Sequence, residues 1–459
     1  KCLWKIPETA RYFEAMVRGR RYDEIAGITS SVCGICSIGH HTASQKATEN
    51  AFGITISPQT EKFRKLLMHA ENFQSHILHT LYLVLPDLLG MKSVVEVAMA
   101  CSNETKIVTR LHGLGNEMSA LIGGRTTHPI TSILGGFTKL PSEKELEDMR
   151  KKLLASLNDY FAVVELLEKL ATKIPIFTRE TEYISLKDNT DYAILNGNLY
   201  SSDNGFYSNT VYRNVMNEFC VPHSTAKFTK NTRDSFMVGA LARFNNNHDT
   251  LRPLALKVAE KLELKAPCHN PFMNSVAQVI EIAHSIEDSI FLIQEILDEG
   301  IQKEHLKDIY NRADSAIKAG EGIGIVEVPR GLLIHNYKYD EKGLVIEANC
   351  VIPTNMNHWN IQYDLEKLMD TEHADKALGD WDLFKSIVSH RERFTPIRKL
   401  DYSNHTPDKI NIIPPKEVIE AWEKDYQAML GYMIYGEAKK FDALIKRIQE
   451  LQDRIRKIK

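Results

Sequence analysis

The sequence predicts a mainly α-helical protein with one small β-sheet, an α+β fold. Two long segments carry helix start signals followed by apolar residues at helical spacing, and a third is apolar on more than one face. Strand-like alternation is clear in only one stretch, near residues 323–354. The chain has 459 residues, which is enough for one large core or for two to three domains.

The predicted helices begin at recognisable caps. Ser57 followed by Pro58 is typical of an N-cap and a first helical residue, and the pattern after it runs to Pro86. Ser142 and Glu145 have the spacing of a capping box, which predicts a second long helix directly after them.

The remaining elements follow in order along the chain. The segment that begins at Asn270 is apolar on more than one face, so we expect a buried helix. Residues 323–354 predict strands joined by a turn at residues 340–343. After about Asp370 the chain becomes polar and proline-marked. We therefore expect two parts, residues 1–370 and a helical tail of residues 371–459.

Composition excludes several classes of function. Apolar residues make up 43% of the chain, charged residues 25%, and the net charge is −3, so nothing favours nucleic acid as a partner. No apolar run reaches the roughly 20 residues that a membrane-spanning helix needs. The seven cysteines are scattered and odd in number, which is not typical of a disulfide framework. We expect a cytoplasmic protein without a membrane span.

The stretch TSSVCGICSIGHHTAS, residues 29–44, carries the strongest chemical signal. Cys33 and Cys36 lie three residues apart, and His40 follows four residues later. The pair fits half of a zinc site, although no second pair follows at usable spacing. It also fits a thioredoxin-like dithiol, although the strand–helix context is not evident. A third reading is half of a soft-metal site with distant partners, and a fourth is two small buried residues.

The residues around this pair resemble a known family. The segment RYFEAMVRGRRYDEIAGITSSVCGICSIGHHTASQKATENAFGI closely resembles the first metal-binding segment of the nickel–iron hydrogenase large subunit. Later blocks resemble that family in the same order: QSHILHTLYLVLPDLLG, GGRTTHPITSILGGFTKLPS, FMVGALARFNNN, VEVPRGLLIHNYKYDEKGLVIEANCVIPT and NHWNI. The resemblance covers roughly residues 8–365. It is strongest to the soluble, cofactor-coupled branch (sulfhydrogenase, F420- or viologen-reducing type) and implies that family's helical core.

The resemblance implies roles for individual residues. Cys33 would be a terminal nickel thiolate, and Cys36 would bridge nickel and iron. His40 would hold the bridging thiolate by a hydrogen bond, unless it is a satisfied core histidine. Arg330 would orient hydrogen bonds to an iron cyanide and assist the heterolysis of H2. Its structural alternative is a salt bridge to a carboxylate such as Glu327.

Further residues and cofactors follow from the same resemblance. Pro353 and Thr354 would frame the other cyanide, and His128 and Arg125 resemble residues near the site, with structural or proton-transfer roles. The implied cofactor is a nickel–iron centre with CO and CN ligands. Iron–sulfur clusters and flavin would belong to partner subunits.

The sequence departs from the family pattern in three places. The second Cys pair of the family is absent, because no cysteine follows Cys350. The early Arg-Ile-Glu-Gly-His block is missing, and Ser31 stands where the family has an arginine. The resemblance implies a nickel–iron centre with four thiolate ligands, and Cys33 and Cys36 supply only two. The chain is therefore expected to be incomplete or joined to foreign sequence, to take its second pair from another polypeptide, or to have a decayed site like the hydrogenase-like subunit of complex I.

The tail, residues 371–459, does not resemble the end of a hydrogenase large subunit. Residues 371–459 are weakly similar to the C-terminal helical part of nucleotidyltransferase-type toxins of abortive-infection systems, through features such as His390 and the Pro414–Pro415 pair. The catalytic strand–turn of those enzymes is not in the chain, so no transferase activity is expected from it.

The expected function is that of a nickel–iron hydrogenase large subunit in a hetero-oligomer. The reaction is H2 ⇌ 2H⁺ + 2e⁻, with electrons passed to an iron–sulfur small subunit. Further expected partners are cofactor-reducing subunits of the flavin, F420, NAD(P) or heterodisulfide type. The alternatives are a metal-free, hydrogenase-like electron-transfer or scaffold subunit, and a toxin-type nucleotidyltransferase fusion.

Overall fold

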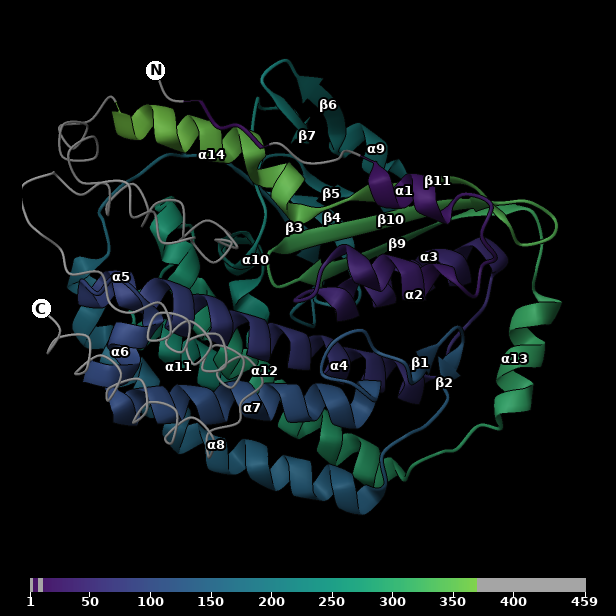
Figure 1. Cartoon of the computed structure of the whole chain (residues 1–459), viewed down its shortest axis with the longest axis horizontal. Coiled ribbons are helices and arrows are strands. Elements are labelled where there is room, and N and C mark those ends of the chain that lie inside the picture. Colours follow the sequence, from purple (N-terminus) through teal and green to yellow (C-terminus); the bar gives the residue numbers. More distant parts are fainter. Residues whose placement is uncertain (1–2, 7–10, 370–459) are drawn as a thin grey trace, which may run out of the picture.

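The computed structural model describes residues 3–6 and 11–369, and Figure 1 shows a layer of long helices beneath a sheet-containing layer. The predicted α+β fold is confirmed. The helical layer consists of α4 (Pro58–Ile77), α7 (Ser102–Gly123), α8 (Glu143–Leu170) and α12 (Asn274–Glu299). The shorter helices are α1 (Tyr12–Val17), α2 (Ile25–Thr29), α5 (Leu85–Leu89), α6 (Val94–Ala100), α9 (Tyr212–Val215), α10 (Ala240–Asn247), α11 (Pro253–Lys261), α13 (Leu306–Ser315) and α14 (Pro353–Met369).

The predicted helix starts are confirmed. The Ser57 hydroxyl accepts the Thr60 N–H at 3.1 Å, which caps α4. In the capping box of α8, the Ser142 N–H donates to Glu145 at 2.8 Å, and the Glu145 N–H donates back to the Ser142 hydroxyl. Both caps satisfy backbone donors that a helix start otherwise leaves without partners.

The predicted run from Ser57 to Pro86 is helical throughout, but it changes geometry near its end. After α4 the chain widens into a π-helical segment, Leu78–Val84, before α5 carries Pro86 in its first turn. A proline has no N–H to donate to the preceding turn, and a widened turn relieves the lost bond. The predicted burial of α12 is also confirmed, because most of its residues are inaccessible to solvent.

The predicted strands form an antiparallel sheet of β9 (Gly320–Val328), β10 (Gly331–Tyr339) and β11 (Val345–Val351), with β10 in the middle. The turn after β10 closes with a hydrogen bond from the Gly343 N–H to the Asp340 carbonyl. Because β10 pairs Ile334 with Val351, the chain leaving β11 emerges at the same end of the sheet as the β9–β10 turn.

Helix α3 (Ser37–Phe52) lies directly on β9, as Figure 1 shows in the upper layer. Glycine occupies alternate positions of β9 at Gly320, Gly322 and Gly324. A Cβ atom at Gly324 would lie 2.0 Å from the Ala43 carbonyl oxygen, so only glycine allows this approach. The contact places the first turn of α3 at the end of β9, next to the β9–β10 turn.

The structure contains more strands than the sequence predicted. They are β1 (Ser132–Ile133), β2 (Gly136–Phe137), β3 (Glu182–Lys187), β4 (Asn198–Ser201), β5 (Gly205–Tyr207), β6 (Asn217–Val221), β7 (Ser224–Lys230) and β8 (Phe236–Met237). Four of them form a sheet in the order β5-β4-β3-β8, and β6 with β7 forms a hairpin. Each is only two to seven residues long, so it lacks the sustained alternation that marks a strand in sequence.

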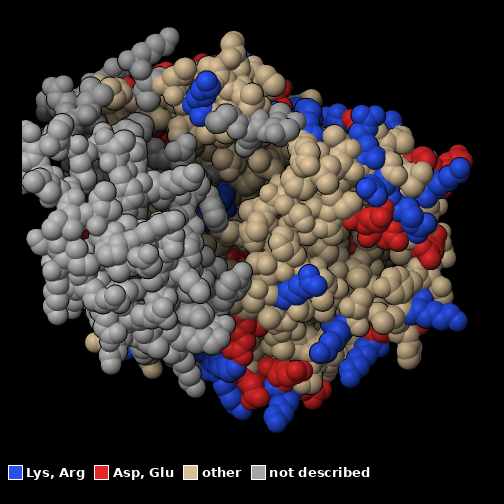
Figure 2. Space-filling model, viewed as in Figure 1, with Lys and Arg blue, Asp and Glu red and all other residues tan. Residues whose placement is uncertain are grey.

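Within residues 3–6 and 11–369, no helix is both long enough and apolar enough to cross a membrane. Figure 2 shows charged side chains gathered toward the rim of one face, with a largely uncharged stretch over α2 and α3.

The expected division between residues 1–370 and 371–459 falls at the edge of the described residues. The tail, with its predicted helices and toxin-like features, lies outside them.

Candidate metal centre

Cys33 and Cys36 lie on one turn just before α3. Cys33 is extended, Cys36 is the N-cap of α3, and their Cα atoms are 5.4 Å apart. The Cys36 N–H donates to the Cys33 sulfur at 3.2 Å, and the two half-buried sulfurs are joined as a disulfide. A cysteine binds metal as its thiolate, not as a disulfide. This turn therefore offers two soft ligands to one ion once the pair is reduced.

Glu71 of α4 holds the helix that Cys36 begins. Its fully buried carboxylate accepts the Ile38 N–H at 2.7 Å and the Gly39 N–H at 3.1 Å. Burial raises the pKa of Glu71 to about 8, while the two N–H groups and the charge of Arg330 act in the opposite direction. Glu71 therefore fixes the first turn of α3, and the sequence analysis missed it.

Arg330 lies in the turn between β9 and β10, at the same end of the sheet as the start of α3. A Cβ atom at Gly39 would lie 2.0 Å from Val328 Cγ1, so this turn sits against the first turn of α3. The half-buried Arg330 donates from Nη1 to the Ser75 hydroxyl of α4 at 2.9 Å. Its positive charge also lowers the pKa of Glu71, against the larger effect of burial.

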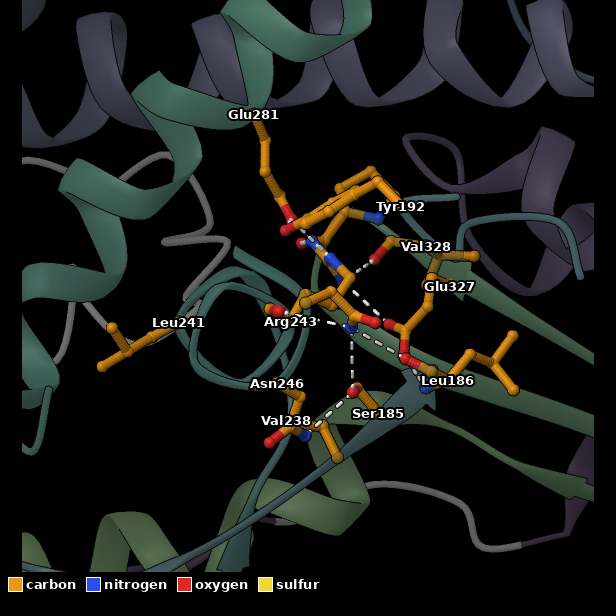
Figure 3. Close-up of polar contacts among 12 residues, drawn as sticks. Ser185, Leu186, Tyr192, Val238, Leu241, Arg243, Asn246, Glu281, Glu327 and Val328 are labelled. Atoms are coloured by element: carbon orange, nitrogen blue, oxygen red, sulfur yellow. Dashed lines mark hydrogen bonds and ion pairs between the residues drawn. The ribbon is translucent and has the colours of Figure 1, made fainter. Parts of the chain in front are cut away.

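Glu327, the expected alternative partner of Arg330, is bonded to Arg243 instead. Figure 3 shows the Arg243 guanidinium lying between Glu327 and Glu281, all three from different elements. Arg243 also donates to the Val328 and Pro329 carbonyls at 2.9 and 3.2 Å. This fully buried arginine thus anchors the turn that carries Arg330.

His40 is buried one turn into α3. Its Nδ1 lies 3.0 Å from Nε2 of His335 on β10, and His335 Nδ1 lies 2.5 Å from the Tyr337 hydroxyl. Burial lowers the pKa of His40 to about 3, so the ring is neutral. The hydrogen bond between His40 Nδ1 and His335 connects α3 to the sheet and leaves Nε2 as the ring nitrogen that does not take part in it.

The remaining predicted residues fall at the same end of the sheet or beside it. Pro353 and Thr354 are the first residues of α14, just after β11 ends. The end of β11 pairs with the start of β10, so these residues lie at that end of the sheet. The His128 N–H donates to the Ser37 hydroxyl at 2.8 Å, next to Cys36, and its backbone is left-handed with φ 53°. Arg125 is exposed on the same loop.

The described residues bring together two of the four thiolates that the resemblance implies. The other described cysteines are free: Cys220 lies in β6, Cys350 in β11, Cys101 between α6 and α7, and Cys268 in the segment after α11. Cys350 is buried, and its backbone N–H donates to Glu14. Soft donors therefore fit nickel and iron at Cys33 and Cys36, but the described part of the chain does not complete the site.

Comparison with protein-family models finds the nickel-dependent hydrogenase family over residues 11–113. The alpha chain of sulfhydrogenase 1 of Pyrococcus furiosus is 33% identical over 371 residues, which cover 81% of this chain and 85% of that protein. One chain of the F420-non-reducing hydrogenase of Methanothermobacter marburgensis is 26% identical, with 90% of each chain covered.

The fold is similar to that of a solved enzyme. A crystal structure of an NAD⁺-reducing NiFe-hydrogenase in the H2-reduced state matches with a TM-score of 0.72 and 23% identity. The match covers 84% of this chain and 90% of that one. The weak similarity of residues 371–459 to toxins has no support in these comparisons. The Methanothermobacter alignment covers 90% of this chain, whereas residues 1–370 are only about 81% of it. That alignment therefore extends past residue 370.

Proposed function

Because this chain belongs to the nickel-dependent hydrogenase family, we propose that its Cys33–Cys36 turn holds one half of a nickel–iron centre. The chain is the large subunit of a nickel–iron hydrogenase, an oxidoreductase that acts on H2. The observation that supports the site is convergence: the cysteine turn, Arg330 and the start of α14 meet at one end of the β9–β11 sheet.

The proposed roles follow from the chemistry of the side chains. Cys33 and Cys36 would hold the centre once both are reduced, Cys33 as the terminal nickel ligand and Cys36 as the bridging thiolate. His40 would donate from Nε2 to the Cys36 sulfur, because its Nδ1 is already engaged with His335. When bound, the metals with their CO and CN ligands supply the heterolytic cleavage of H2.

The cationic and neutral donors around the turn suit anionic ligands. Arg330 presents a guanidinium that Ser75 orients at 2.9 Å, and a fixed guanidinium is a good donor to a cyanide nitrogen. Thr354 and the backbone after Pro353 supply donors for a second cyanide. We propose that the two missing thiolates come from a segment that this sequence does not contain.

The partners of the chain follow from its family. Its relatives are named as single subunits of larger hydrogenases, so the enzyme is assembled from several chains. We propose an iron–sulfur small subunit that accepts the electrons and a flavin-containing subunit that reduces a soluble cofactor, in the cytoplasm. The alternatives, a toxin fusion or a metal-free scaffold protein, are not favoured by these relatives.

The test is a purification of the full chain with the polypeptides that accompany it, followed by metal analysis and H2-dependent viologen reduction. Cys36→Ser is expected to lose most of the nickel and iron and more than about 100-fold of the turnover, because one bridging ligand is gone. Cys101→Ser, a free cysteine on a separate helical segment, is the matched control and should change neither. Unchanged metal content in Cys36→Ser would overturn the assignment.

A further inference from the structure

Helix α3 and strand β10 share three buried polar side chains in a row, His40, His335 and Tyr337, which we call the imidazole chain. His40 Nδ1 lies 3.0 Å from His335 Nε2, and His335 Nδ1 lies 2.5 Å from the Tyr337 hydroxyl oxygen. His335 and Tyr337 are fully buried, and His40 is only 2% exposed. The three side chains therefore satisfy one another in place of solvent.

The fold directs the imidazole chain toward α3. Strand β10 pairs His335 with Gly324 of β9, and directly opposite residues of an antiparallel pair point to the same face. A Cβ atom at Gly324 would lie 2.0 Å from the carbonyl oxygen of Ala43 in α3, so this is the face that α3 covers (Figure 1). Tyr337, two residues further along β10, lies on the same face. The glycine lets the helix come close enough for the His40 ring to reach His335.

His40 connects the imidazole chain to the cysteine turn. It follows Cys36 by four residues in α3, and its backbone N–H donates to the Cys36 carbonyl at 3.1 Å. Side chains four residues apart share a helical face, and each leans toward the N-terminus of its helix. Because His335 engages Nδ1 of His40, Nε2 is the ring nitrogen that remains for the cysteine side.

All three groups of the imidazole chain are neutral. Burial lowers the pKa of His40 to about 3 and lowers that of His335 well below its ordinary value. Burial also raises the pKa of Tyr337 well above its ordinary value. A neutral imidazole has one N–H and one lone pair, so each histidine donates at one nitrogen and accepts at the other. The direction of one hydrogen bond in the chain therefore fixes the direction of the next.

Tyr337 sets that direction, because its O–H must donate to one of its neighbours. Besides His335 Nδ1, the groups beside it are the Thr29 and Ser44 hydroxyls and the Cys350 thiol. A neutral imidazole nitrogen is a far stronger base than a hydroxyl or a thiol, and 2.5 Å is at the short end of hydrogen-bond distances. Ser44 Oγ has no other hydrogen-bond partner among the described residues, so it can donate to the phenol oxygen. The Tyr337 O–H therefore donates to His335 Nδ1.

The remaining hydrogen bonds follow in order. Since His335 accepts at Nδ1, it carries its hydrogen on Nε2 and donates it to His40 Nδ1. His40 then carries its own hydrogen on Nε2, the nitrogen on the cysteine side. The opposite order would turn a lone pair of Nε2 toward the cysteine turn, and a lone pair repels a thiolate.

We propose that Tyr337 and His335 are positioning residues that hold His40 in the tautomer protonated at Nε2, with its N–H directed to the Cys36 sulfur. Groups behind the ligands of a metal centre act in this way, by fixing which atom of a neighbouring ring bears hydrogen. The use of that N–H rests on the proposed function, whereas the tautomer itself requires no metal. No proton moves along the imidazole chain, and its effect is confined to the tautomer and orientation of His40.

The test measures the tautomers by NMR in the full chain, reduced, free of metal and labelled with ¹⁵N-histidine. His40→Gln and His335→Gln assign the signals, because each removes one ring. In the wild type we expect at least about 90% of each ring to be protonated at Nε2, a ratio of the size that one hydrogen bond supports. In Tyr337→Phe the donor is lost, and the tautomer ratio of both rings should shift at least about threefold toward Nδ1.

Tyr339→Phe is the matched control, because it also removes a buried hydroxyl that β10 presents to α3. The Tyr339 hydroxyl bonds to Thr48 at 2.7 Å and not to a histidine, so this variant should keep the wild-type tautomers. Melting temperatures check that each variant is folded. A His40 ring protonated at Nδ1 in the wild type would overturn the proposal without any variant, and so would unchanged tautomers in folded Tyr337→Phe. A complex without nickel or H2 turnover would refute the proposed function but would not alter these tautomers.

Discussion

Glu71 shows how a single buried carboxyl can position a metal ligand that it does not touch. One of its oxygens accepts both N–H groups of the turn that follows Cys36. The free N–H groups of a helix start favour the carboxylate, while complete burial favours the neutral acid. Burial is the larger effect, so the pKa of Glu71 is raised to about 8.

This raised pKa makes stability depend on pH in a defined direction. The folded state holds the Glu71 proton up to about pH 8, whereas the unfolded chain releases it near 4.5. The stabilisation is complete below pH 4.5 and is lost as pH rises toward 8, by up to about 5 kcal/mol. In Glu71→Gln the Gln side chain imitates the neutral acid and does not titrate. Urea unfolding should therefore show a smaller loss of free energy of unfolding between about pH 5 and pH 8 for this variant than for the wild type.

The control for that measurement is Glu165→Gln, an exposed position on α8. Its free energy of unfolding should follow the wild-type curve across the same pH range. A Glu71→Gln variant that loses stability with pH as steeply as the wild type would show that the carboxyl titrates near its ordinary value.

Residues in local motifs could be predicted from sequence, and residues paired at long range could not. Cys33, Cys36 and Arg330 stand within recognisable segments, and the structure brings those segments to one end of a sheet. Glu71 and Arg243 carry no such signal, because their partners lie 33 and 38 residues away in the chain. A charged residue on an apolar helical face was the only available hint.

At the scale of elements, the close contact between α3 and β9 sets the position of the cysteine turn. Gly322 and Gly324 let the helix backbone lie directly on the strand, and a Cβ at either would lie 2.0 Å from a carbonyl oxygen of α3. Gly324→Ala forces α3 away from β9. It should lower the free energy of unfolding by at least about 1–3 kcal/mol, as overpacking of a core does, and reduce bound metal with it.

Gly27→Ala provides the matched control for this contact. Gly27 is exposed in α2, and a Cβ there would meet nothing within 4 Å. Alanine in a helix should raise the free energy of unfolding by up to about 1 kcal/mol. If thermal unfolding shows the two variants equally stable, the glycines of β9 do not govern the approach of α3.

Helices with strong local signals were predicted to within a few residues, and the minor sheets were not. The caps at Ser57 and Ser142 act within one turn, so their effect is visible in the sequence itself. Strands such as β4 and β8 span only four and two residues and are defined by what pairs with them. Their hydrogen-bond partners come from other segments, and tertiary structure alone selects them.

At the scale of the whole molecule, the residues that the structure describes bring two thiolates, those of Cys33 and Cys36, to one place in the fold. The start of α3, the β9–β10 turn and the start of α14 lie at one end of the sheet formed by β9, β10 and β11, and the other described cysteines lie elsewhere. A soft-metal site with half its thiolates binds weakly, since each missing ligand leaves a coordination position to water.

This incompleteness predicts the metal content of the chain by itself. Residues 1–459, purified alone and reduced, should hold less than about 0.2 nickel per chain after dialysis, because two thiolates do not retain the ion. Metal analysis compares it with the Cys33→Ser/Cys36→Ser double variant, which should show the same low value. One tightly bound nickel per wild-type chain, lost in the double variant, would mean that this chain contains the missing ligands among its own residues.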